Sequence, residues 1–191
     1  MMQEEGLDRI VLEKLKMDYS PANMEDWKKM VYKIQHPSKK VKVAVVGKYV
    51  ELPDAYMSVT EALHHAGIAN DTDVKIHWVN SETIEDPSID LSEIFVGCKG
   101  ILVPGGFGDR GVEGKIKAIQ YARENNIPFL GLCLGMQCAV IEFARHVCGL
   151  TDANSTEFNE DTPHPVIALM DSQVNVEKKG GTMRLGAYPC K

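Results

Sequence analysis

The chain has 191 residues, of which 44% are hydrophobic and 25% charged, as in a globular protein of one to one and a half domains. Its net charge is −6 and no basic cluster is longer than Lys39-Lys40, which argues against nucleic acid as a partner. The sequence has no membrane-length apolar run, no signal-peptide pattern and no framework spacing among its five cysteines, so we expect a cytoplasmic protein with free thiols and no membrane partner.

The first forty residues differ in character from the rest. Apolar side chains recur at helical spacing within residues 4–16, and a second helix is expected from Asn23, a plausible N-cap, to about Gln35. Residues 36–40 then have the composition of a linker. We therefore expect residues 1–40 to form a unit separate from residues 41–191.

From residue 41 onward, apolar strands alternate with helices. The pattern predicts strands at 41–46, 74–79, 100–103 and 127–132, and helices at 54–65, 115–125 and 134–147. We expect Gly67 to end the first of these helices, and Met136, Val140, Phe143 and Val147 to share one face of the last. This alternation predicts an α/β fold with a doubly wound, mostly parallel sheet.

Three loops follow strands of this expected sheet, at residues 47–49, at residues 104–111 and at Cys133. Because ligands of parallel α/β sheets bind beyond the carboxyl ends of the strands, we expect the three loops to converge on one cleft.

Cys133 is the most informative residue of the chain. An apolar strand runs into it, a helical pattern follows it at once, and glycines lie two positions before and two after it, at Gly131 and Gly135. This is the pattern of a nucleophile elbow, a tight turn that has no room for side chains at the glycine positions. The helix N-terminus favours a thiolate there, so we interpret Cys133 as a nucleophile rather than a packing residue.

The glycine-rich segment 104–111 follows the third expected strand. Its accessible backbone N–H groups are suited to an anion, either a phosphate or the oxyanion of an acyl-transfer reaction. The segment lacks the Gly-Lys-Ser/Thr ending of a phosphate loop, and its pairing with Cys133 favours an oxyanion hole formed by the N–H groups of Gly106 and Leu134.

A cysteine nucleophile normally needs a histidine base. None of the six histidines occurs in a His-Pro-Glu setting after a strand, and each is interpreted as a structural or surface residue. We therefore expect the catalytic base to be absent from this sequence.

Segments 104–108 and 131–137 together resemble the class I glutamine amidotransferases. Four further segments, 47–56, 110–114, 154–158 and 180–186, are similar to those of the CTP synthase family. The resemblance implies a flavodoxin-like amidotransferase fold that is incomplete at its C-terminus. It also implies that residues 1–40 are the end of an amidoligase domain with its linker, and residues 41–191 a partial glutamine amidotransferase domain.

The resemblance further implies the reaction. Members of this family convert UTP to CTP with ATP and L-glutamine, and a cysteinyl thioester releases ammonia to the amidoligase domain of the same chain. They use ATP with Mg²⁺, are activated by GTP and form tetramers. For this segment we expect no cofactor and no metal site.

Site residues are carried over from the resemblance position by position. It implies Cys133 as the nucleophile, Gly106 and Leu134 as oxyanion donors, and Glu157 as the partner of the substrate's α-amino group. The glutamine pocket would also include Gly135, Met136 and Gln137, and a lid involved in the GTP response would include Phe107, Arg110, Glu113, Thr182 and Arg184. The family's catalytic histidine and glutamate are expected beyond Lys191, so this chain should have little glutaminase activity by itself.

Two other functions fit the residues less completely. One is an elbow-type cysteine hydrolase or redox-sensing protein of similar fold. The other is a non-catalytic interaction module that uses the free edge of an incomplete sheet.

Overall fold

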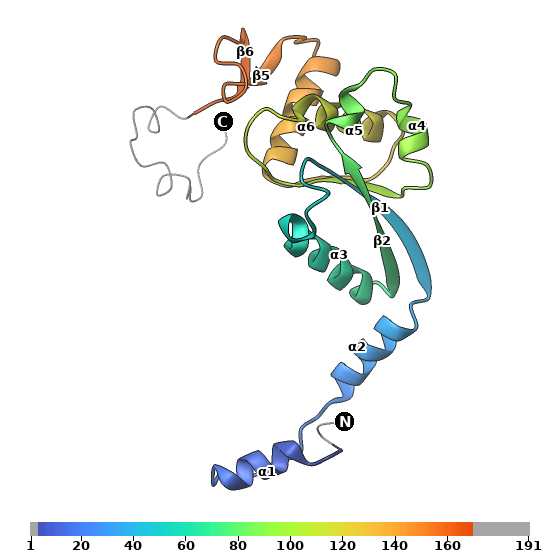
Figure 1. Cartoon of the computed structure of the whole chain (residues 1–191), viewed down its shortest axis with the longest axis vertical. Coiled ribbons are helices and arrows are strands. Elements are labelled where there is room, and N and C mark those ends of the chain that lie inside the picture. Colours follow the sequence, from blue (N-terminus) through green and yellow to red (C-terminus); the bar gives the residue numbers. More distant parts are fainter. Residues whose placement is uncertain (1–3, 170–191) are drawn as a thin grey trace.

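A computed structural model describes residues 4–169 of the chain, and Figure 1 shows the arrangement of its elements. The helices are α1 (Leu7–Lys14), α2 (Glu25–Gln35), η1 (Pro53–Tyr56), α3 (Met57–Ala69), η2 (Thr83–Glu85), α4 (Leu91–Ile94), α5 (Val112–Glu124) and α6 (Leu134–His146). The strands are β1 (Lys39–Gly47), β2 (Thr72–Asn80), β3 (Gly100–Val103), β4 (Phe129–Gly131), β5 (Ala153–Ser155) and β6 (His164–Ile167).

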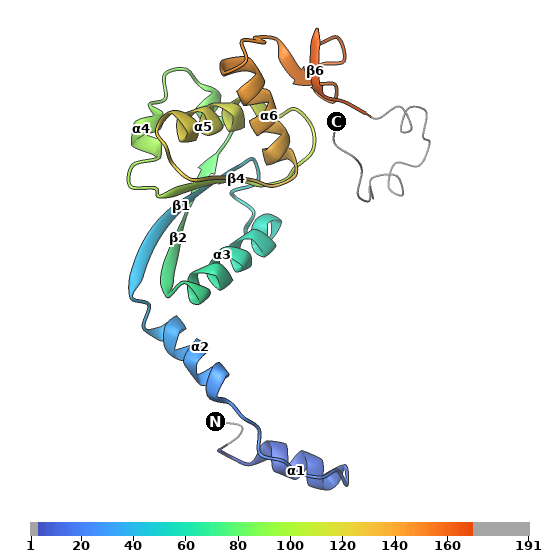
Figure 2. The ribbon, with the colours of Figure 1, turned by 180° about the vertical axis from the view of Figure 1, so that it is seen from behind.

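The main sheet is parallel throughout, with the strand order β2-β1-β3-β4. Helix α3 covers one face of this sheet, and α5 and α6 cover the other (Figures 1 and 2). The doubly wound parallel α/β fold expected from the sequence is thereby confirmed. Strands β5 and β6 form a small second sheet beside α6.

The hydrophobic core lies between the sheet and helices α5 and α6. Val46 and Val103 from the strands meet Ile116 and Ile141 from the two helices, and each is at most 2% exposed. Glu142 of α6 is also buried there, because Arg123 of α5 donates to both of its carboxylate oxygens at 2.8 to 3.2 Å. This ion pair joins the last turn of α5 to α6.

Helices α1 and α2 extend away from the sheet (Figure 1) and contain no buried residue. Asn23 accepts a hydrogen bond from the Glu25 N–H at 3.1 Å, although Met24 is the residue that directly precedes the helix. The expected linker at 36–40 is shorter than predicted, because β1 begins at Lys39 and pairs with Thr72 of β2. The domain division at residue 40 stays a prediction.

The prediction that Gly67 ends a helix was wrong, because α3 continues to Ala69. A Cβ at Gly67 would lie 2.5 Å from the backbone oxygen of Thr72. The glycine therefore permits the close approach of α3 to the start of β2, rather than supplying a left-handed helix cap.

The four large apolar residues expected on one face of α6 do share a face, but that face is exposed: Met136 is 55%, Val140 40%, Phe143 51% and Val147 48% accessible. The buried face carries Leu134, Cys138 and Ile141 together with the carboxylate of Glu142. Cys148 lies beyond the end of α6 and is exposed.

Candidate active site

The turn between β4 and α6 has the strained geometry that its glycines predict. Cys133 adopts φ 51° and ψ −107°, outside the regions that L-residues ordinarily occupy, and its side chain is exposed. A Cβ at Gly131 would stand 2.6 Å from the backbone carbon and oxygen of Gly135. The flanking glycines therefore allow the backbone of α6 to turn back sharply and present the thiol to solvent.

The glycine-rich loop lies directly beside this turn. A Cβ built on Gly105 would lie 3.4 Å from the Cβ and 3.9 Å from the Sγ of Cys133, and one built on Gly106 would lie 3.5 Å from Leu134. Within residues 4–169, the N–H groups of Gly106 and Leu134 donate to no protein acceptor. Two free backbone donors thus accompany an exposed thiol, as an oxyanion hole requires.

The loop after β1 reaches the same place, since the ammonium of Lys48 donates to the carbonyl of Phe107. Phe107 itself is 72% exposed at the tip of the glycine-rich loop. Arg110 pairs with Glu82 at 3.2 Å and lies over the ring of Tyr49, 5.7 Å from its centroid. The expected convergence of the three loops is confirmed by these contacts.

Glu157 comes to the glycine-rich loop from the segment after β5. One of its carboxylate oxygens accepts the N–H of Gly108 at 3.1 Å, across 49 residues of sequence. Its backbone is held by Ser155, whose hydroxyl accepts the Glu157 N–H at 3.2 Å. The carboxylate assigned by resemblance to an ammonium group is therefore anchored at the loop that adjoins Cys133.

The other expected site residues that the structure describes lie in the first turns of α6 and α5. Gly135 is buried against β3, Met136 is exposed, and the N–H groups of Met136 and Gln137 both donate to the Cys133 carbonyl. Glu113, which the resemblance assigns to the lid, is held by Arg145 of α6 at 2.9 and 3.0 Å. Thr182 and Arg184 lie outside the described residues.

The sequence pattern did not reveal two cations near the site, Lys115, which is buried, and Arg145, which is partly buried. Lys115 is 1% exposed, and a Cβ at Gly106 would lie 3.9 Å from its ammonium. Burial lowers the pKa of Lys115 below its ordinary value. In the sequence, each residue is a charged position within an apolar helical pattern. Such a position usually faces solvent, so the pattern does not indicate burial.

No described residue forms a hydrogen bond with the Cys133 sulfur. His77 contacts the Ile94 carbonyl at 3.0 Å and His146 contacts Glu142 of its own helix. These partners fit the structural interpretation of both histidines. The position of a catalytic base stays a prediction.

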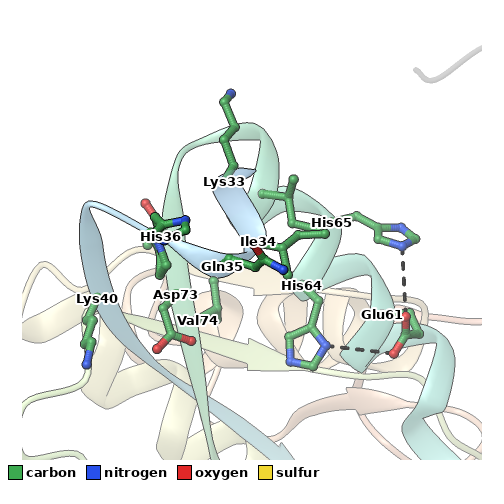
Figure 3. Close-up of a pocket in the computed structure, with 13 residues that line it drawn as sticks. Lys33, Ile34, Gln35, His36, Lys40, Glu61, His64, His65, Asp73 and Val74 are labelled. Atoms are coloured by element: carbon green, nitrogen blue, oxygen red, sulfur yellow. Dashed lines mark ion pairs between the residues drawn. The ribbon is translucent and has the colours of Figure 1, made fainter. Parts of the chain in front are cut away.

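A groove of about 830 Å³ lies between α2, α3 and the beginning of β2 (Figure 3). The two carboxylate oxygens of Glu61 lie there 3.8 Å from Nδ1 of His64 and 3.9 Å from Nε2 of His65. This groove adjoins the amino ends of β1 and β2, whereas Cys133 follows the carboxyl end of β4. It is therefore separate from the candidate active site.

Residues 4–169 contain no cluster of three or more histidine, cysteine or acidic side chains that could hold a metal ion. In the same range, no helix has the length and apolar character needed to cross a bilayer.

Comparison with known proteins agrees with this geometry. The CTP synthase of Desulfitobacterium hafniense is 62% identical over 98% of this chain. The CTP synthase of Moorella thermoacetica is 59% identical over the whole of this chain. The chain spans 35% of the length of each of these relatives. A solved structure described as the Trypanosoma brucei CTPS glutaminase domain with bound acivicin is 49% identical, with a TM-score of 0.67 over 71% of this chain and 52% of that one.

The sequence model of the family described as "Glutamine amidotransferase class-I" matches residues 51–191, which include the strained turn at Cys133 and the glycine-rich loop at 104–111. The fold, the exposed thiol and this match lead to one conclusion: the chain belongs to the class-I glutamine amidotransferase family.

Proposed function

We propose that this chain is the glutamine-hydrolysing part of a CTP synthase. The observation that carries the proposal is the position of Cys133, exposed at a strained turn with Gly105 beside it and two N–H groups next to it that have no acceptor within residues 4–169. Similarity to CTP synthases along the whole chain supports this function over an elbow-type hydrolase, a redox sensor or a non-catalytic module.

In the proposed reaction, the Cys133 thiolate attacks the side-chain carboxamide carbon of glutamine and forms a C–S bond. The negative oxygen of the tetrahedral intermediate accepts hydrogen bonds from the N–H groups of Gly106 and Leu134. The C–N bond then breaks, ammonia leaves with a proton from a general acid, and water hydrolyses the thioester to glutamate and the free thiol. We place the residue that transfers these protons beyond Lys191.

The Glu157 carboxylate would bind the substrate's α-ammonium group through charge-assisted hydrogen bonds. Gly135, Met136 and Gln137 would line the pocket, while Phe107, Arg110 and Glu113, with Thr182 and Arg184, would take part in a GTP response. For the longer protein we propose an amidoligase domain that uses the ammonia, ATP and Mg²⁺, assembly as a tetramer, and a cytoplasmic location.

A thiol-labelling experiment tests the glutamine site on the chain itself. Acivicin, an amino-acid electrophile, should modify Cys133 and leave Cys148 unmodified, although both thiols are exposed. Iodoacetamide, which lacks the amino-acid group, should modify both. Added L-glutamine should slow the reaction of acivicin and leave that of iodoacetamide unchanged, as mass spectrometry of the peptides would record. Equal labelling of the two cysteines by acivicin would overturn the proposal.

A further inference from the structure

Arg145, on the last turn of α6, bonds two other elements at once. Its side chain is 15% exposed. Its Nη1 atom lies 3.0 and 2.9 Å from the two carboxylate oxygens of Glu113, and its Nε donates to the carbonyl of Ala153 at 2.7 Å. One guanidinium therefore joins α5, α6 and β5.

Each of these three elements carries one part of the candidate site. Helix α6 begins directly after Cys133, and Glu113 lies in the first turn of α5, directly after the glycine-rich loop. Strand β5 begins at Ala153 and leads to Glu157. The guanidinium therefore lies where the supports of the thiol, the oxyanion donors and the ammonium-binding carboxylate meet.

The connection from Ala153 to Glu157 is short and well held. Ala153 and Ser155 are 0% and 2% exposed, and the Thr156 N–H donates to the Ile167 carbonyl of β6 at 2.9 Å. The Ser155 hydroxyl accepts the Glu157 N–H, so a shift of β5 would carry the Glu157 carboxylate with it. The second tie, from the Gly108 N–H to that carboxylate, is exposed and donated by a glycine at φ 74°.

We propose that Arg145 is a positioning residue that sets the spacing between the Cys133 thiol and the Glu157 carboxylate, and thereby the affinity for the amino-acid end of glutamine. The inference rests on the proposed roles of those two residues. Arg145 itself does not touch the substrate. It suits this role because its rigid planar fork donates in two directions at once, toward Glu113 and toward Ala153, which a lysine ammonium on a flexible stem reproduces poorly.

The test separates binding from bond formation by measuring acivicin inactivation of Cys133 over a range of concentrations. In R145K and R145M we expect the half-saturating concentration to rise about tenfold, since small misplacements of binding groups are costly. The maximal inactivation rate and the rate with iodoacetamide should stay unchanged, because the turn that holds Cys133 is intact. Iodoacetamide thus reports any general loosening of the fold.

Arg123 provides the matched control. It also joins α5 to α6 by a bidentate ion pair, with Glu142, but among the described residues it has no bond to β5. R123M should lower the melting temperature and leave the half-saturating concentration of acivicin unchanged. R145K keeps the positive charge at this position, so if R145M does not fold, the result is taken from R145K.

An unchanged half-saturating concentration in R145K, or an equal rise in R123M, would overturn the role of Arg145. Failure of acivicin to label Cys133 in the unsubstituted chain would instead overturn the proposed function, so the two failures are distinguishable.

Discussion

Gly135 lies so close to Val103 that a Cβ at this glycine would stand 2.1 Å from the Val103 carbonyl oxygen and 2.9 Å from its carbonyl carbon. Gly135 belongs to the first turn of α6, and Val103 is the last residue of β3 before the glycine-rich loop. This backbone contact therefore fixes the position of Cys133 relative to the loop that carries the Gly106 N–H.

We expect G135A to lower the free energy of unfolding by about 3 kcal/mol, because the added methyl group meets backbone atoms that cannot move aside easily. G149A is the control. Gly149 has φ 75° and nothing within 4 Å of its Cβ position, so only backbone strain of about 1 kcal/mol should appear. Urea unfolding measures both, and G135A should also change the acivicin labelling of Cys133. Equal destabilisation by the two substitutions would contradict the close contact.

Cys138 should make the stability of the protein fall at alkaline pH. Burial raises its pKa from 9.0 to about 11, so between these values the unfolded chain loses the thiol proton while the folded chain keeps it. Stability from this group is complete below pH 9 and is lost as pH rises toward 11, by about 3 kcal/mol in all.

The measurement for Cys138 is the difference in unfolding free energy between the unsubstituted chain and C138A from pH 8 to 11. This difference should shrink as pH rises, whereas the difference from C148A, which removes an exposed thiol, should stay constant. A constant difference for C138A would show that the thiol is not shielded from solvent.

Replacing Lys115 with methionine should stabilise the protein near neutral pH by about 1–2 kcal/mol. Its ammonium is buried and has no hydrogen bond or ion pair within residues 4–169. Because burial lowers its pKa, the unfolded chain binds more protons between the folded value and the ordinary 10.5, so this group makes stability rise with pH in that window.

K115M should abolish that alkaline rise. The control is K117M, because the neighbouring Lys117 ammonium donates to the carbonyls of Ile84 and Glu85, and its loss should destabilise the protein. Thermal unfolding from pH 7 to 10.5 would compare the two variants. A melting temperature of K115M below that of the unsubstituted chain near neutral pH would contradict the prediction.

Short-range patterns in the sequence predicted most of the fold and the strained turn at Cys133. The strand at 100–103 and the beginning of the helix at Leu134 agree with the structure to the residue. The turn at Cys133 could be recognised because it depends on neighbours only two positions away, Gly131 and Gly135, whose lack of side chains permits the turn.

Periodicity could not predict which face of α6 is covered. It shows that Met136, Val140, Phe143 and Val147 share a side, but the side that packs is decided by what the other elements bring to it. The opposite side carries Leu134, Cys138 and Ile141, which pack in the core, and Arg123 pairs with the Glu142 carboxylate that is buried beside them. Gly67 was misjudged for the same reason, since its contact with Thr72 belongs to the packing of α3 on β2.

The sequence by itself determined the α/β class, the order of the elements and the tight turn at Cys133, because each depends on residues that are close together along the chain. Only the tertiary structure decided that Arg145 joins Glu113 to Ala153, that Glu157 meets Gly108 and that Lys115 is buried beneath the loop. Those partners are separated along the chain by 8 to 49 residues, and the hydrogen bonds between them exist only once the helices have packed on the sheet.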